Sequence, residues 1–150
     1  MQVTGVDSSK TGIAAARNLL PSAKFYEMSV YDDTERLPDR DFDAVVSTEV
    51  VEHLYSLQAL PCFASSILRP SGLLIIFTPY HGFLKNLAVS LFNGWDAHHT
   101  PLWEGGHIKF WSRKTLTHLL EKNGFVVISF HGAGRLPLLW KSMILVARKV

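Results

Sequence analysis

The chain has 150 residues, 47% of them hydrophobic, which suits one ordinary domain with a real core and argues against wholesale disorder. Its net charge of +2 is small and its basic residues are scattered, which argues against a dedicated nucleic-acid groove. No apolar run reaches the ~18 residues of a membrane span, and the N-terminus does not resemble a signal peptide. The one cysteine, Cys62, cannot form an internal disulfide, which favours a reducing cytoplasm.

Strand and helix patterns alternate through the first fifty residues. The predicted elements, in chain order, are a strand at 2–7, a helix at 10–20, a strand at 23–30 and a strand at 42–47. Ser8 or Ser9 is expected to cap the first helix, and Pro21 to end it. The polar residues 31–41 are expected to form a turn.

The alternation continues through the remaining hundred residues. The predicted elements are a helix at 55–68, a turn at 69–72, a strand at 73–79, helices at 82–92 and 113–123, and strands at 125–132 and 137–149. The last two strands are predicted to form an antiparallel hairpin. Residues 93–111 have no period and hold three of the four tryptophans. This order predicts a largely parallel α/β sheet with helices on both faces, in which ligands bind beyond the carboxyl ends of the strands.

Acidic residues follow the first two predicted strands. Asp7 ends the first, where a carboxylate can accept hydrogen bonds from both hydroxyls of a ribose, or can equally serve as an acid at a helix N-terminus. In "SVYDD", Tyr31 could pack on an adenine ring and an acidic side chain could bind its edge, or the stretch is a solvated turn. The sequence does not distinguish Asp32 from Asp33 in this role.

The stretch "STEVVEHL" places Glu49, Glu52 and His53 just after the third predicted strand. If the stretch turns helically, residues at i, i+3 and i+4 share one face, and the three side chains converge. Two carboxylates and an imidazole suit a divalent cation with open coordination positions. Without a metal, His53 could act as a general base oriented by a glutamate. A hydrogen-bonding network at a strand-to-helix junction explains the same residues.

A fourth metal-ligating residue elsewhere in the chain would favour a metal site over the other two explanations. His107 in "GGHIKFW" follows two glycines that permit close backbone approach, and His81, His98 and His99 are the alternatives.

Taken together, five stretches resemble the Rossmann-like methyltransferases that use S-adenosylmethionine (SAM): "VTGVDSSKTGIAAAR", "FYEMSVYDD", "FDAVVSTEVVEHL", "LRPSGLLIIFTPYHG" and the "KNGF" segment with its hairpin. The chain most resembles the ubiquinone-biosynthesis O-methyltransferases. In that group, an E-x-x-E-H element is associated with a divalent cation, usually Mg²⁺. The small-RNA 2′-O-methyltransferases share this element and carry a histidine in a setting similar to "HIKFW".

The resemblance implies a role for each candidate residue. It implies SAM contacts from Asp7, Ser8, Tyr31, Asp32, Ser47 and Thr48, with Asp7 at the ribose, Tyr31 or Asp32 at the adenine, and Ser47 and Thr48 beside the methionine part. It implies Glu49, Glu52, His53 and His107 as a metal or catalytic cluster, with His53 and Glu52 catalytic. The tryptophan-rich residues 93–111 would cover a small-molecule acceptor.

The chain departs from this family at its N-terminus. Such enzymes begin with a strand and a G-x-G-x-G turn that approaches the cofactor, and none of the ten glycines forms that motif in the right place. The first strand and helix of the family are therefore expected to be missing from a single, N-terminally truncated domain over residues 1–150. In the family, the missing strand lies between the strands predicted at 2–7 and 42–47.

These observations favour a cytoplasmic SAM-dependent O-methyltransferase acting on a small hydroxylated or phenolic acceptor. Three alternatives remain open: methylation of an RNA 2′-hydroxyl, a non-catalytic fragment or assembly subunit, and an NAD-dependent oxidoreductase that shares Asp7. The sequence is compatible with an oligomer.

Overall fold

The computed structural model describes residues 2–150. The chain forms two compact units, Met1–Asp39 and Arg40–Val150. The expectation of a single domain over residues 1–150 stays a prediction. No helix among the described residues has the length and apolar character needed to cross a membrane.

The first unit is a small parallel βαβ arrangement. Strand β1 (Thr4–Asp7) pairs in parallel with β2 (Lys24–Glu27), and helix α1 (Lys10–Leu19) connects them. A short 3₁₀ helix, η1 (Thr34–Arg36), follows. The Ser9 hydroxyl accepts the Gly12 N–H at 3.1 Å, so Ser9 is the N-cap of α1 and Ser8 is not.

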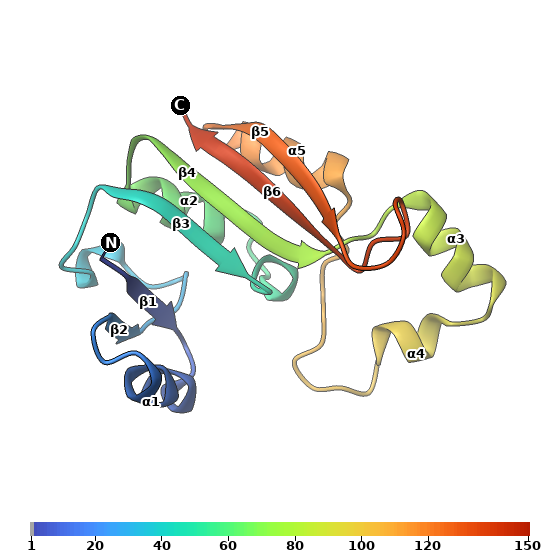
Figure 1. Cartoon of the computed structure of the whole chain (residues 1–150), viewed down its shortest axis with the longest axis horizontal. Helices are drawn as coiled ribbons and strands as arrows, with labels where there is room; N and C mark the ends of the chain where they lie inside the picture. Colours follow the sequence, from blue (N-terminus) through green and yellow to red (C-terminus); the bar gives the residue numbers. More distant parts are fainter. Residues whose placement is uncertain (1) are drawn as a thin grey trace. The chain divides into compact units, whose positions relative to one another are not determined.

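The second unit is built on a four-stranded sheet with the order β3-β4-β6-β5 (Figure 1). Strands β3 (Phe42–Thr48) and β4 (Leu68–Pro79) pair in parallel. Strands β5 (Phe125–Ala133) and β6 (Ser142–Lys149) form the expected antiparallel hairpin, and β6 also pairs with β4.

Four α-helices and one 3₁₀ helix accompany this sheet. They are η2 (Val51–His53), α2 (Ala59–Ile67), α3 (Phe83–Leu91), α4 (Trp95–His99) and α5 (Arg113–Lys122). Helix α4 lies in the segment that has no sequence period and was not predicted. The turn predicted at 69–72 falls inside β4, where Ser71 has a left-handed φ of 62° and the register with β3 shifts.

The core of the second unit lies on one face of its sheet. Helices α2 and α5 both lie on this side in Figure 1 and bury alternate residues of β4 and β6, among them Leu74, Ile76 and Leu145. The intervening residues, such as Ile75 and Val146, are only half-buried. Within this unit the two helices therefore cover one face, and the expected covering of both faces is not seen.

Four strands have one edge without a strand partner among residues 2–150: β1 and β2 in the two-stranded sheet, and β3 and β5 in the four-stranded sheet. Val46, in the middle of β3, is 65% exposed. The expected absence of the family's first strand stays a prediction.

Candidate active site

The chain reverses direction sharply after β3. Glu49 adopts a left-handed φ of 52°, and its N–H donates to the Phe77 carbonyl of β4 at 3.0 Å. The following turn is the single 3₁₀ turn η2 rather than an α-helix. The expected i, i+3, i+4 face therefore does not form, because Glu49 lies outside the helical turn.

Residues 108–111 are hydrogen-bonded to this turn. The N–H groups of Ile108 and Lys109 both donate to the Glu52 carbonyl at 3.0 Å. The buried Trp111 indole N–H donates to the Val51 carbonyl at 3.2 Å. Just upstream, Gly105 has a φ of +84°, a conformation that favours glycine. These contacts fix "HIKFW" beside η2 and place His107 next to His53.

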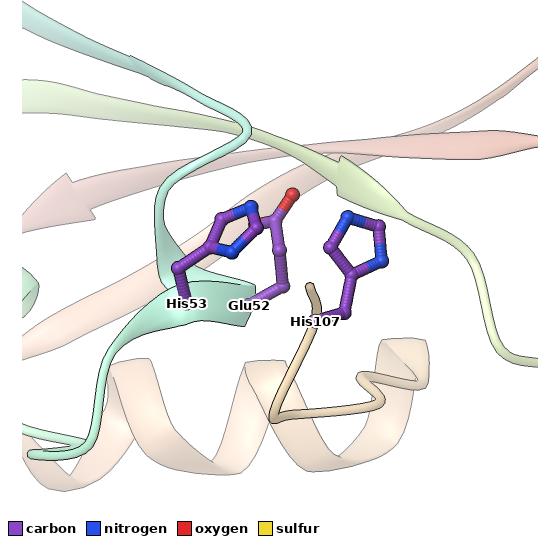
Figure 2. A group of neighbouring side chains, drawn as sticks. All are labelled: Glu52, His53 and His107. Carbon is purple, nitrogen blue, oxygen red and sulfur yellow. The ribbon is translucent and has the colours of Figure 1, made fainter. Parts of the chain in front are cut away.

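Three side chains converge where the segments meet. Glu52, His53 and His107 each offer a possible ligand atom, and these atoms lie within 4.8 Å of one another (Figure 2). The two imidazole rings have centroids 4.9 Å apart and are inclined by 71°. No other such group of three histidine, cysteine or acidic residues occurs among residues 2–150.

The Glu52 carboxyl is buried and only partly satisfied. The residue is 1% exposed, its Oε2 accepts the Thr78 hydroxyl at 3.0 Å, and its Oε1 has no hydrogen-bond partner within residues 2–150. Burial is the main cause that raises the pKa of Glu52 from 4.5 to about 7, and the nearby charge of Glu49 contributes to the same rise. Burial also lowers the pKa of His107, as does the charge of His53. His107 is therefore mainly neutral at pH 7, the form that can bind a metal or accept a proton.

Glu49 stands apart from the other predicted ligands. It is exposed and does not belong to the group within 4.8 Å, although its charge reaches both Glu52 and His107. Thr78, by contrast, was not predicted. The only hint in the sequence was a hydroxyl residue in the apolar run "LLIIFTP", which at 0% exposure requires a buried partner.

The chemistry of the trio fits a divalent cation. One carboxylate oxygen without a partner and two adjacent imidazoles provide the oxygen and nitrogen atoms that borderline cations such as Zn²⁺ and Mn²⁺ accept. The same arrangement can take a proton from a bound hydroxyl without a metal.

A cavity of about 410 Å³ opens beside the trio. Its walls include His53 and His107 together with Tyr55, His99 and Trp103. The edge of the Trp103 ring approaches both His53 and His107, at centroid distances of 6.5 and 6.4 Å. This volume lies within the range of small-molecule sites, and its aromatic walls suit a planar ligand.

The predicted ribose-binding carboxylate lies in the first unit. Asp7 is exposed at the end of β1, and its Oδ1 accepts the Ser9 N–H at 2.6 Å. This contact orients the carboxylate at the start of α1. Ser8, also exposed, lies between these two residues in the chain.

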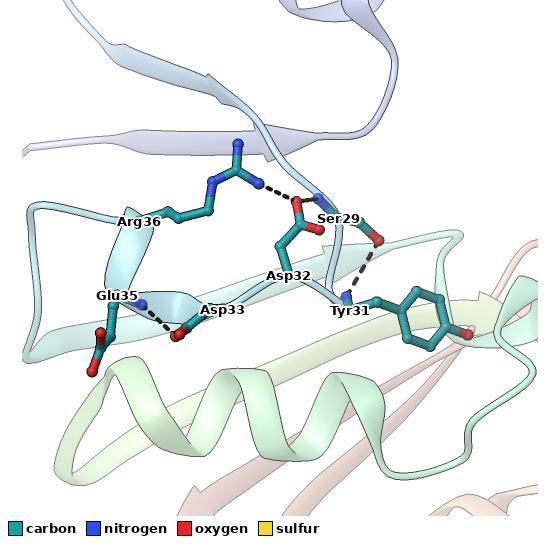
Figure 3. A network of polar contacts seen from close by, with 6 residues as sticks. All are labelled: Ser29, Tyr31, Asp32, Asp33, Glu35 and Arg36. Carbon is teal, nitrogen blue, oxygen red and sulfur yellow. Dashed lines mark hydrogen bonds and ion pairs between the residues drawn. The ribbon is translucent and has the colours of Figure 1, made fainter.

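The structure distinguishes the two adjacent aspartates after β2 (Figure 3). Asp32 Oδ2 accepts the Ser29 N–H at 3.1 Å and pairs with the Arg36 guanidinium at 2.7 Å. Asp33 caps η1 through the Glu35 N–H at 2.9 Å. The Tyr31 N–H donates to the Ser29 hydroxyl, and the residue is 53% exposed.

The remaining predicted cofactor contacts end strand β3. Ser47 is buried, and its hydroxyl has no hydrogen-bond partner within the described chain, whereas Thr48 is exposed. The cofactor roles of Asp7, Ser8, Tyr31, Asp32, Ser47 and Thr48 stay predictions.

Known proteins resemble this chain along most of its length. A family model described as a methyltransferase domain matches residues 1–130. A probable S-adenosylmethionine-dependent methyltransferase of Mycobacterium tuberculosis H37Rv is 30% identical over 135 residues, covering 87% of this chain and 44% of the relative. A ubiquinone biosynthesis O-methyltransferase of Rhodopseudomonas palustris BisB18 is 31% identical over 145 residues, covering 91% and 54%.

A solved structure supports the fold. The PH0226 protein of Pyrococcus horikoshii OT3 superposes with a TM-score of 0.73 at 18% identity, covering 100% of this chain and 72% of that chain. At this identity the likeness shows the fold alone. The chain spans about half the length of the curated relatives it matches.

Trp111→Phe tests the attachment of residues 107–111 to η2. Removing the indole N–H leaves a buried Val51 carbonyl without its donor, so we expect the free energy of unfolding to fall by about 1–2 kcal/mol. Urea denaturation measures this loss. The matched control is Trp103→Phe, because Trp103 is 58% exposed, and it should change stability by less than about 0.5 kcal/mol. Equal losses in the two variants would contradict the anchoring role of Trp111.

The raised pKa of Glu52 predicts a pH dependence of stability. Its pKa moves from an ordinary 4.5 to about 7, so the folded state holds this proton more tightly than the unfolded state. The contribution of Glu52 to the free energy of unfolding should therefore fall by up to about 3 kcal/mol from pH 4.5 to 7 and change little above 7, while the lowered pKa values of His81, His98, His99 and His107 act in the opposite direction. Urea denaturation with a chelator present should show that Glu52→Gln removes this component.

Glu121→Gln, at an exposed position on α5, is the control for that pH series. It should keep the wild-type dependence. A Glu52→Gln profile parallel to the wild type across this range would show that Glu52 titrates normally.

Proposed function

Because the chain belongs to the methyltransferase-domain family, we propose that it forms part of a SAM-dependent enzyme that methylates a hydroxyl oxygen of a small, phenolic acceptor. The observation that carries this proposal is the Glu52–His53–His107 trio at the wall of the 410 Å³ cavity. The names of the curated relatives support the cofactor, and those of the ubiquinone-pathway relatives support oxygen as the methylated atom.

The acceptor would occupy the cavity with its ring against Trp103 and Tyr55 and its hydroxyl toward the imidazoles. In the transfer, the hydroxyl proton passes to an imidazole nitrogen, and the oxygen lone pair attacks the methyl carbon. Bound SAM would supply the methyl group on a sulfonium, which would leave as a neutral thioether that keeps the electron pair of the carbon–sulfur bond. The reaction needs little beyond alignment and proton removal, so positioning supplies much of the rate.

We propose His53 and Glu52 as the catalytic pair. His53 lines the cavity, while Glu52 is buried behind it, where its carboxyl can orient an imidazole or compensate its positive charge. If the site takes Mg²⁺ or another divalent cation, Glu52, His53 and His107 would hold it, with Glu49 within electrostatic reach. Such an ion would stabilise the acceptor oxyanion as a Lewis acid.

The predicted contacts would each bind one part of the cofactor. Asp7, held at the start of α1 by the Ser9 N–H, would bind the ribose hydroxyls. Tyr31 would pack on the adenine, and the buried Ser47 hydroxyl would bind the methionine part. The enzyme would work in the cytoplasm.

Calorimetry with S-adenosylhomocysteine tests cofactor binding by the chain itself. We expect micromolar affinity, reduced about tenfold or more in Asp7→Asn because a neutral amide binds the ribose diol less strongly. A folded sample that gives no heat would favour a non-catalytic role for this chain. The control is Asp43→Asn, at an exposed carboxylate in β3 that pairs with Arg69.

Substitutions in the trio test catalysis, in a form of the protein extended by the glycine-bearing strand of such enzymes. His53→Ala and Glu52→Ala should abolish methylation of a phenolic acceptor while SAM affinity stays near that of the wild type, because neither residue is a proposed cofactor contact. Radiolabelled methyl transfer measures the first and calorimetry the second. His118→Ala, an exposed histidine on α5, is the matched control.

Full turnover in both variants would remove the trio from catalysis. Chelation of the wild type distinguishes the two chemical roles. Loss of turnover that added Mg²⁺ or Mn²⁺ restores indicates a metal site, and unchanged turnover indicates proton transfer to an imidazole.

A further inference from the structure

A second cavity lies in the unit Arg40–Val150, away from the trio's lining residues. It has a volume of about 420 Å³ and lies between α3 and the loop that joins β5 to β6. The residues that line it are Lys85, Ala88, Val89, Arg135, Leu136 and Leu139. The lining is therefore apolar apart from two cations and contains no acidic residue.

Lys85 is a buried charge without a counter-ion. It is 3% exposed, and its ammonium donates to the carbonyl oxygens of Tyr80 at 2.6 Å and Lys141 at 3.5 Å. Burial, together with the charges of Arg135 and Lys141, lowers its pKa from 10.5 to about 8. At neutral pH it remains largely protonated. Carbonyl dipoles compensate a buried ammonium less completely than an anion does.

Lys85 and its two neighbouring cations, Arg135 and Lys141, have no carboxylate partner within residues 2–150. The ion pairs found within residues 2–150 join Lys24 to Asp39, Arg36 to Asp32 and Arg69 to Asp43. The charges of Arg135 and Lys141 both act unfavourably on the Lys85 ammonium, and Lys85 and Arg135 line the same cavity with its apolar walls. A bound anion would relieve this repulsion.

The three neighbouring histidines are the alternative, as possible ligands of a metal ion. The rings of His81, His98 and His99 have centroids 4.7–6.0 Å apart, and the buried His81 Nε2 has no hydrogen-bond partner within the described chain. The charge of Lys85, however, lowers the pKa of all three histidines. A dication would meet the same repulsion, so the local charge favours an anion.

The loop on the other side of the cavity exposes apolar side chains. Leu136 is 69% exposed and Leu138 is 50% exposed. Arg135 and Leu138 hold left-handed backbone angles, with φ of 58° and 67°, a strained conformation for residues other than glycine. The strained turn places a guanidinium and a leucine side by side at the cavity wall.

We propose that this cavity binds an amphipathic anion, with its carboxylate or phosphate head near Arg135 and Lys85 and its hydrocarbon chain against Val89, Leu136 and Leu139. The head would form charge-assisted hydrogen bonds with the guanidinium, and the chain would cover the exposed leucine. The head and the chain both contribute to affinity, so a small anion or a neutral hydrocarbon chain should bind more weakly than the amphipathic anion. The proposal does not depend on methyl transfer.

Calorimetry with decanoate, kept below the concentration at which it forms micelles, tests the proposal on the wild-type chain. We expect saturable binding at one site. Decanol, acetate and inorganic phosphate should each bind at least about tenfold more weakly, since each lacks either the charge or the chain. Equal affinity for decanol would remove the role of the cations, and equal affinity for phosphate or acetate would remove the role of the apolar walls.

Variants on the exposed loop locate the site with little risk to folding. Arg135→Gln and Leu136→Asp should each weaken decanoate binding about tenfold or more, with the thermal unfolding midpoint near that of the wild type. Lys122→Gln, at an exposed lysine on α5, should bind as the wild type does. Unchanged affinity in Arg135→Gln, or no binding by the wild type, would overturn the proposal.

Vesicles of phosphatidylglycerol distinguish binding of a single amphiphile in the cavity from binding to a lipid surface. The cavity predicts that monomeric decanoate binds whether or not vesicles are present. Sedimentation with the vesicles and no binding of monomeric decanoate would assign the basic residues to a membrane surface and contradict the cavity site.

Discussion

Three hydrogen bonds to the carbonyl oxygens of Val51 and Glu52 organise the candidate site. They come from residues 108, 109 and 111, more than fifty positions later in the chain. Two of the donors are backbone N–H groups. The contact between residues 108–111 and η2 therefore depends more on backbone conformation than on side-chain identity. It brings two histidines to one buried carboxyl and closes one wall of the neighbouring cavity. The η2 turn thus follows strand β3 and supports the segment that would cover an acceptor.

The second unit contains two buried charges of opposite sign that lack counter-ions. The Glu52 carboxyl has its pKa raised, and the Lys85 ammonium has its pKa lowered, each chiefly by burial. Each charge by itself lowers the stability of the folded state, because burial removes it from water. Uncompensated groups of this kind often mark functional positions. Complementary ligands would be a cation or an acceptor proton at Glu52 and an anionic head at Lys85.

Much of the architecture could be predicted from the sequence. Hydrophobic periodicity indicated every strand, Ser9 was one of two residues expected to cap the first helix, and "EVVEHL" with "HIKFW" contained the three residues of the trio. The short helix α4 could not be predicted, because five residues show no clear period. The left-handed Glu49 was missed because such backbone angles depend on tertiary contacts, here with Phe77. Thr78 was missed because its partner, Glu52, lies 26 residues away.

The strand edges on β1, β2, β3 and β5 have no strand partner among residues 2–150. Each presents a row of backbone amides and carbonyls that a further strand could satisfy. A donated strand could come from an extension of the chain, from a separate peptide or from another copy of the chain. Supplying the strand as a peptide would make its concentration a control on folding and hence on any activity the fold supports. Without it, the same edges are sites for strand exchange and aggregation.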